Sequence, residues 1–154
     1  MYVYDSSRTG QTNKRLSVAY QLKKAESHPG SYDSVTLFFN SNRASYVSYS
    51  VESKYTSLAN GQKATSGTLV FNFYDKIAST NVSYATVEVK RTSSSRLDYG
   101  ATWIHSYTET NVNVSLNPGI SFGGVGLVSG SVGVSINFSS NEKTWSLSDT
   151  GYYS

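Results

Sequence analysis

Two histidines and ten carboxylates are the side chains of this sequence that could carry acid–base or metal chemistry. His105 lies in WIHSY, inside a segment of alternating apolar residues, and we predict that its imidazole is hydrogen-bonded and partly buried. His28 precedes Pro29-Gly30 and is expected to be a solvated loop residue. The carboxylates are isolated in the sequence, so nothing in their spacing indicates a paired acid and base.

Recognisable catalytic and cofactor motifs are missing from the sequence. No serine lies in a G-x-S-x-G motif, no metal-ligand spacing is present, and there is no cysteine. The glycine-rich stretch GISFGGVGLVSG lacks the lysine of a phosphate-binding loop. We therefore predict a protein that is not an enzyme, with neither a cofactor nor a metal site.

Aromatic residues give the strongest indication of a binding surface. Thirteen Tyr and two Trp exceed what a core of this size needs, so some of them must face water. Such rings have a flat apolar face and a polar tip, which suits sugar rings, lipid headgroups and protein partners. Cross-strand tyrosine pairs that only stabilise the sheets are the alternative. The candidate binding residues are Tyr46, Tyr99, Tyr107, Trp145, Tyr152 and Tyr153.

Alternation of apolar and polar residues with a period of two predicts strands along most of the chain. The clearest candidate strands span residues 15–22, 34–40, 46–55, 68–74, 82–90 and 101–108. In the third of these, Val47, Tyr49 and Val51 are expected on one face and Tyr46 on the other. The pattern predicts an all-β fold, a single-domain antiparallel β-sandwich or up-and-down barrel of roughly nine to ten strands. One domain would span residues 1–154, with residues 1–14 a possible short edge strand and loose N-terminal arm.

Residues 111–141 carry no charged side chain. Alternating apolar residues and the turn Asn117-Pro118-Gly119 predict three consecutive antiparallel strands there. A soluble sheet with one wet face and a membrane-inserting hairpin both explain this pattern. The soluble sheet is favoured because the run from Val132 to Phe138 is shorter than the roughly 9 to 11 residues of a membrane strand. The apolar residues of this possible membrane or assembly segment are Val112, Val114, Leu116, Ile120, Phe122, Val132, Val134, Ile136 and Phe138.

Charge and composition bear on partners and compartment. The formal net charge is only +3 and the basic residues are scattered, which argues against nucleic acid as a partner. Abundant Ser, Thr, Asn and Tyr with few charges is typical of secreted, extracellular β-proteins. Two of three potential N-glycosylation sequons fall on predicted strands, where a glycan would be awkward, so a bacterial source is favoured.

Two functions remain open from the sequence. The first is a secreted, non-catalytic binding protein that contacts a cell envelope, a glycan or a protein partner through exposed Tyr and Trp and a Ser/Asn-rich surface. The second is a pore-forming or otherwise membrane-active toxin that inserts the uncharged region 111–138. Under either function, open sheet edges would favour self-association.

Overall fold

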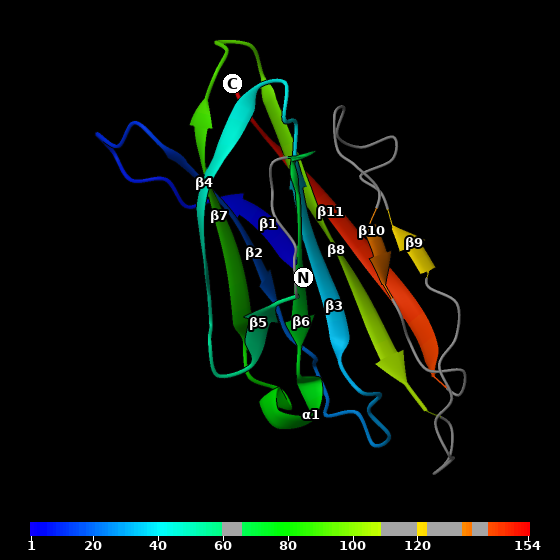
Figure 1. Ribbon diagram of the computed structural model, residues 1–154. Helices are drawn as coiled ribbons and strands as arrows, with labels where there is room; N and C mark the ends of the chain where they lie inside the picture. The colour runs from blue at the N-terminus through cyan, green and yellow to red at the C-terminus, as the bar shows by residue number, and fades with distance from the viewer. Residues whose placement is uncertain (60–65, 109–119, 123–133, 137–141) are drawn as a thin grey trace.

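The computed structural model describes residues 1–59, 66–108, 120–122, 134–136 and 142–154 (Figure 1). Residues 120–122 and 134–136 are described as backbone strands only. Two antiparallel sheets pack together. The first sheet contains, in spatial order, β1 (Tyr2–Asp5), β2 (Lys14–Tyr20), β7 (Ser83–Arg91) and β4 (Ala44–Val51). The second contains β11 (Lys143–Tyr153), β8 (Leu97–Tyr107), β3 (Asp33–Phe39), β6 (Thr68–Phe73) and β5 (Thr56–Leu58).

Three further elements lie outside these two sheets. The strands β9 (Ile120–Phe122) and β10 (Val134–Ile136) pair with each other in an antiparallel two-stranded sheet. The turn of helix α1 (Asp75–Ala78) follows β6 directly. The all-β sandwich predicted from the sequence is confirmed, and within the described residues the two sheets do not close into a barrel.

The core lies between the two sheets because alternate residues of each strand point inward. On β2, the inward residues Leu16, Val18 and Tyr20 are all 1% exposed or less. Tyr20 meets two aromatic rings of the second sheet, with centroid distances of 4.8 Å to Phe73 and 6.1 Å to Trp103. Burial of such rings is the main stabilising contribution, at roughly 25 cal/mol per Å² of apolar surface.

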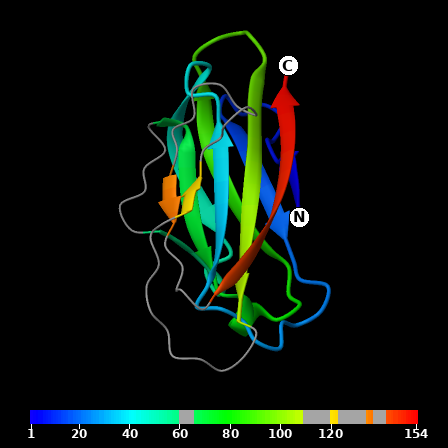
Figure 2. The same cartoon turned by 90° about the vertical axis from the view of Figure 1, so that its right-hand side faces the viewer.

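The N-terminal strand closes one side of the sandwich. Strand β1 pairs along β2, and the amide of Val3 donates a hydrogen bond to the Asp149 carboxylate on β11 at 2.8 Å. This bond joins the edge of the first sheet to the edge of the second, and β1 and β11 lie beside each other in Figure 2. Residues 2–5 are therefore an edge strand, as the sequence suggested.

Strand β4 contains an irregularity that the sequence did not predict. Tyr46 pairs with Val89 and Ser48 pairs with Glu88, so Val47 is the extra residue of a β-bulge. The bulge shifts the phase of the strand. Tyr46 and Tyr49 come to lie on the same side, and Val47 is 44% exposed. The prediction that Val47 and Tyr49 share a buried face opposite Tyr46 is therefore wrong.

The structure describes two short parts of the uncharged region. Ile120, Phe122, Val134 and Ile136 lie on the backbone strands β9 and β10. The other apolar residues predicted as a membrane or assembly segment lie outside the described residues, namely Val112, Val114, Leu116, Val132 and Phe138. Among the described residues, no helix has both the length and the apolar character needed to span a membrane.

Candidate functional site

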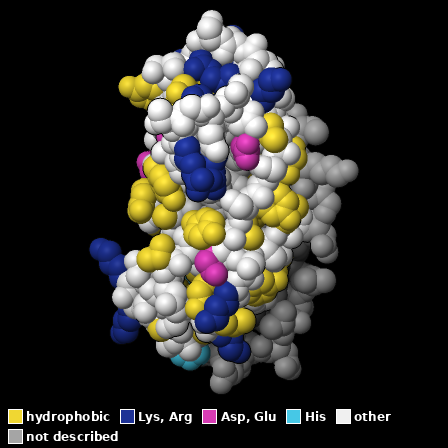
Figure 3. Space-filling model, turned by 90° about the vertical axis from the view of Figure 1, so that its left-hand side faces the viewer, with side chains coloured by type: hydrophobic (Ala, Val, Ile, Leu, Met, Phe, Trp, Pro, Cys, Tyr) yellow, Lys and Arg dark blue, Asp and Glu magenta, His cyan; other side chains and the backbone are white. Residues whose placement is uncertain are grey.

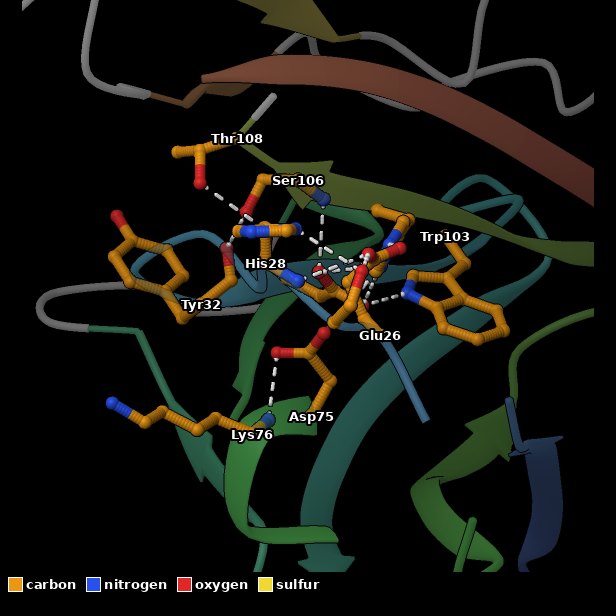
Figure 4. A network of polar contacts seen from close by, with 11 residues as sticks. Glu26, His28, Tyr32, Asp75, Lys76, Trp103, Ser106 and Thr108 are labelled. Atoms are coloured by element: carbon orange, nitrogen blue, oxygen red, sulfur yellow. Dashed lines mark hydrogen bonds and ion pairs between the residues drawn. The ribbon is translucent and has the colours of Figure 1, made fainter. Parts of the chain in front are cut away.

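A buried group of acidic residues surrounds His105 where β3 begins and β8 ends. Asp33 is the first residue of β3, and its carboxylate accepts hydrogen bonds from the Trp103 indole N–H at 2.7 Å and the Ser106 amide at 2.9 Å. His105 Nδ1 donates to the same carboxylate at 2.9 Å. Asp33 and His105 are 0% and 1% exposed. Figure 4 shows Trp103 and Ser106 directed toward this acidic centre from β8.

Two further carboxylates reach the same imidazole. Asp75, at the start of helix α1, places Oδ2 3.6 Å from His105 Nδ1, and Glu26 Oε2 lies 3.4 Å from Nε2 (Figure 4). His105 is hydrogen-bonded as predicted, and it is more deeply buried than the partial burial expected from the sequence. His28 is exposed, also as predicted. The convergence of three carboxylates on one histidine was not visible in the sequence, because loop residues 21–32 and helix α1 bring Glu26 and Asp75 to the site only in the folded chain.

Burial and mutual repulsion perturb the protonation of this group, which we call the acidic cluster (Glu26, Asp33, Asp75 and His105). Burial, reinforced by the charge of Asp33, raises the pKa of Asp75 to about 6. Burial alone would lower the pKa of His105, but its hydrogen bond to Asp33 and the surrounding carboxylates outweigh that effect and raise it. The His28 amide, which donates to Glu26, lowers the pKa of that carboxyl despite partial burial.

A pocket of about 240 Å³ connects the acidic cluster to the surface. Glu26 and Asp75 line it, together with Ala25, Ser27, Pro29, Lys76 and Ser79. The pocket is large enough for several water molecules or an ion with its hydration shell.

A second candidate site lies on the outward side of the first sheet. Tyr2 and Tyr4 on β1 and Tyr84 on β7 are 59%, 36% and 41% exposed. In the strand register, Tyr2 is opposite Ala19 of β2, and Ala19 is opposite Tyr84. The rings therefore border β2 on both sides, about 10 Å apart at the backbone, which is two strand spacings.

The floor between these rings is made of small side chains. Ser17, Ala19 and Thr86 point outward from the central strands but are 5% exposed or less. The hydroxyls of Ser6, Ser17 and Thr86 form a continuous chain of hydrogen bonds at 2.6 Å and 2.7 Å. We call the rings and this floor the tyrosine surface (Tyr2, Tyr4, Ser17, Ala19, Tyr84 and Thr86).

Hollows lie at both ends of the tyrosine surface. One, of about 190 Å³, is lined by the polar residues Arg15, Ser48, Ser50, Thr86 and Glu88 with Tyr49 at its edge. The other, of about 310 Å³, lies beside Tyr2 and is lined by Met1, Tyr2, Ala19, Tyr20, Gln21, Lys23 and Val82. Figure 3 shows separate hydrophobic patches on this side of the molecule, with both basic and acidic residues between them.

The six aromatic residues predicted to bind a ligand do not form one surface. Tyr99 is 3% exposed and packs in the core against Gly151, so the prediction that it is exposed is wrong. Tyr99 lies in β8, where the alternation of the strand points its side chain inward. The sequence pattern did not show this because it placed the start of the strand at residue 101. Tyr46 packs partly against the core because of the bulge in β4.

The remaining four predicted residues are surrounded by neighbouring side chains to different degrees. Tyr107 stacks on His105 with centroids 6.0 Å apart, and Trp145 lies 5.4 Å from Trp103 while remaining 39% exposed. Arg96 lies over the ring of Tyr152 at 4.1 Å. Lys14 and Arg91 lie over the ring of Tyr153 at 4.3 Å and 5.2 Å. Cations thus already occupy faces of both C-terminal tyrosines.

Sequence reasoning missed the residues of the tyrosine surface. Tyr2 and Tyr4 alternate around Val3, which is the signal of a shared strand face, and Tyr84 alternates out of phase with Ala85 and Val87 on the buried side of β7. Only strand order, which is not encoded in the local pattern, shows that these tyrosines face the same way across β2.

Comparison with known proteins gives little that bears on function. No family model and no curated protein sequence matches the chain. A crystal structure of domains D2 and D3 of the major pilin SpaD from Corynebacterium diphtheriae is similar, with a TM-score of 0.43 and 14% sequence identity. The similarity covers 92% of this chain and 49% of that one, so the chain spans about half the length of the pilin structure. The assignment of the fold therefore depends on the strand pairing described above.

Proposed function

We propose that this protein is a non-catalytic, extracellular binding module that holds an uncharged glycan chain on its tyrosine surface. The observation that carries the proposal is the row of Tyr2, Ala19 and Tyr84, in which exposed rings on two strands flank a small, nearly buried alanine on the strand between them. A pyranose ring is amphipathic, with apolar C–H faces and polar edges, and a tyrosine side chain offers the matching combination.

The shape of the surface supports a sugar chain as its ligand. The backbone positions of Tyr2 and Tyr84 are about 10 Å apart, so a single sugar chain lying across β2 would contact both rings. The hollows at both ends extend the surface beyond these rings. An elongated oligosaccharide fits such an arrangement better than a compact small molecule, which binds in an enclosed pocket.

The polar groups are also suited to sugar hydroxyls. Arg15 and Glu88 line the hollow beside Thr86, and Glu88 accepts hydrogen bonds from Asn13 at 2.7 Å and Ser48 at 3.2 Å. These contacts fix the carboxylate before a ligand arrives, which reduces the entropy lost on binding. Because the ionic groups in this hollow have opposite signs, its chemistry favours a neutral glycan over a polyanion.

Binding to immobilised polysaccharides tests the proposal. A panel of neutral β-glucan, chitin and peptidoglycan is incubated with the chain, and affinity for the retained polymer is measured by isothermal titration with its oligosaccharides. Tyr2→Ala and Tyr84→Ala are each expected to weaken binding about tenfold or more, since loss of a central aromatic contact usually costs more than about 1.4 kcal/mol.

Tyr152→Ala is the matched control. Tyr152 is 59% exposed, the same fraction as Tyr2, but it lies on β11 with Arg96 over its ring. Affinity should therefore be unchanged in this variant. Equal losses in Tyr2→Ala and Tyr152→Ala, or failure of every neutral polymer to retain the chain, would contradict the proposal.

A further inference from the structure

The acidic cluster has the composition and spacing of a metal site. One ligand atom from each of Asp33, Asp75 and His105 lies within 4.8 Å of the others, and all three residues are 3% exposed or less. Imidazole nitrogen with carboxylate oxygen is a donor combination typical of Zn²⁺ and related divalent transition metals. The sequence did not predict this site because its three ligands come from β3, α1 and β8.

One oxygen of the cluster lacks a hydrogen-bond donor. Asp75 Oδ2 is buried and accepts no hydrogen bond in the described part of the chain. The other oxygen of the same carboxylate accepts one from the Lys76 amide at 2.9 Å. A buried carboxylate oxygen without a donor is unfavourable by itself, and a ligand that supplies positive charge would satisfy it.

The charges of the cluster are not balanced. Three carboxylates face one imidazole, and among the described ion pairs those of Asp33, Asp75 and Glu26 all involve His105. Even a protonated His105 leaves an excess of negative charge when all three carboxylates are ionised. Burying unpaired charge is expensive, and a divalent cation would offset it.

The distances between the ligand atoms fit a single ion. Two donors that each lie about 2.1 Å from a tetrahedral zinc ion are roughly 3.4 Å apart. His105 Nδ1 lies 2.9 Å from Asp33 Oδ2 and 3.6 Å from Asp75 Oδ2. A small adjustment of these side chains would therefore place all three atoms around one metal.

The residues next to the ligands form the hydrogen bonds that orient the ligands in metal sites. Glu26 lies on the far side of the imidazole, 3.4 Å from Nε2, where it can accept a hydrogen bond from Nε2–H and leave the lone pair of Nδ1 for the metal. Trp103 and Ser106 hold the Asp33 carboxylate in place through their N–H groups. The pocket lined by Glu26 and Asp75 gives access from the surface and room for a water ligand.

We propose that Asp33, Asp75 and His105 bind one divalent transition-metal ion of the zinc class, with Glu26 orienting the imidazole and water completing the coordination from the pocket. On binding, His105 Nδ1 gives up its proton to solvent and exchanges its hydrogen bond with Asp33 for a bond to the metal. The site lies between the start of β3 and the end of β8, so metal and glycan binding are separate properties that fail or succeed independently.

Titration of the EDTA-treated and dialysed chain with ZnCl₂ tests this proposal. Isothermal titration should give one zinc ion per chain, and zinc at about 100-fold above its Kd should raise the Tm by roughly 5 to 10 °C. Nitrogen-15 NMR adds a direct readout, because the Nδ1–H signal of His105 should disappear when zinc replaces that proton. Mg²⁺ and Ca²⁺ at the same concentration should have no such effect, since they prefer all-oxygen sites.

Variants distinguish the buried site from zinc bound at the surface. Asp75→Asn keeps the shape of the side chain and should abolish the zinc-dependent rise in Tm, while Glu26→Gln should weaken affinity about 10- to 100-fold. The controls are Asp98→Asn, which removes a carboxylate on the far part of β8, and His28→Gln, which removes the exposed histidine; both should retain wild-type affinity. Absence of zinc binding, unchanged affinity in Asp75→Asn, or loss of affinity in His28→Gln would overturn the proposal.

Discussion

At the scale of single residues, Asp33 organises the acidic cluster. It is fully buried, and its carboxylate accepts hydrogen bonds from Trp103, His105 and Ser106. These three hydrogen bonds offset the cost of burying the carboxylate, because they replace the hydrogen bonds it would make to water. Without that charge, His105 would have fewer hydrogen-bond acceptors beside it. The Trp103 indole N–H would donate to a weaker acceptor.

Asp33→Asn should therefore be among the most destabilising single substitutions in the chain. We expect a loss of about 3 to 5 kcal/mol in the free energy of unfolding, which is the range for breaking a buried charge pair. Urea denaturation followed by tryptophan fluorescence measures it. Asp98→Asn is the control, because Asp98 is partly exposed and its ion pair with Arg96 contributes little; equal losses in the two variants would show that Asp33 is not central.

The same cluster gives a pH dependence of stability when EDTA keeps metal away. The pKa of Asp75, raised from 3.8 to about 6, and the raised pKa of His105 both mean that the folded state holds protons more tightly than the unfolded state. Their contributions are complete below the ordinary pKa values and are lost as pH rises through the folded ones. Glu26, whose pKa is lowered, acts in the opposite sense: its contribution favours folding above pH 4.5 and is lost at lower pH.

The stability contributed by Asp75 should thus be greatest at about pH 4 and should fall toward pH 8 by roughly 2 to 3 kcal/mol. Urea unfolding at several pH values in EDTA measures this change. Asp75→Asn removes the group whose ionisation is most unfavourable, so the variant should show a much flatter profile between pH 5 and 7. A stability that rises over that interval in the wild-type chain would contradict the assignment.

At the scale of secondary-structure elements, the bulge in β4 decides which side chains are buried. Val47 is the extra residue and is 44% exposed, whereas Leu37 on the central strand β3 is 0% exposed. Val47→Ala should change the free energy of unfolding by less than about 0.5 kcal/mol, and Leu37→Ala should lower it by about 2 to 5 kcal/mol. Chemical denaturation of both variants checks the contrast; a Val47→Ala loss above about 2 kcal/mol would mean that the regular alternation holds after all.

Sequence patterns predicted the regular strands well and failed where the chain is irregular. Strands β2, β3, β6 and β7 lie close to the predicted segments, because each is rich in the β-branched and aromatic residues that strands favour. The bulge in β4 escaped prediction since inserting one residue does not alter composition. Strand β11 was missed because its residues are mostly exposed and give no apolar alternation against polar neighbours. Both candidate sites depend on contacts between distant segments, which local patterns do not encode.

At the scale of the whole molecule, the distribution of charge separates two kinds of glycan partner. The chain carries a net charge of +3, so an anionic polymer would be attracted to it nonspecifically. On the tyrosine surface, however, Ser17, Thr86 and the rings are uncharged, and in the adjoining hollow Arg15 is matched by Glu88. Specific binding there should depend on ring stacking and hydrogen bonds, whereas attraction of a polyanion should depend on ionic contacts.

Salt therefore discriminates between the two. Raising NaCl from about 50 mM to about 500 mM shortens the range of electrostatic interactions to a few ångströms, but leaves stacking and short hydrogen bonds largely intact. We expect the affinity for a neutral oligosaccharide to change less than about threefold over this range, as measured by isothermal titration. An affinity that falls by orders of magnitude over this range, and that Arg15→Ala lowers more than Tyr84→Ala does, would identify an anionic polymer as the ligand. Recognition would then depend on basic residues and not on stacking against the tyrosines.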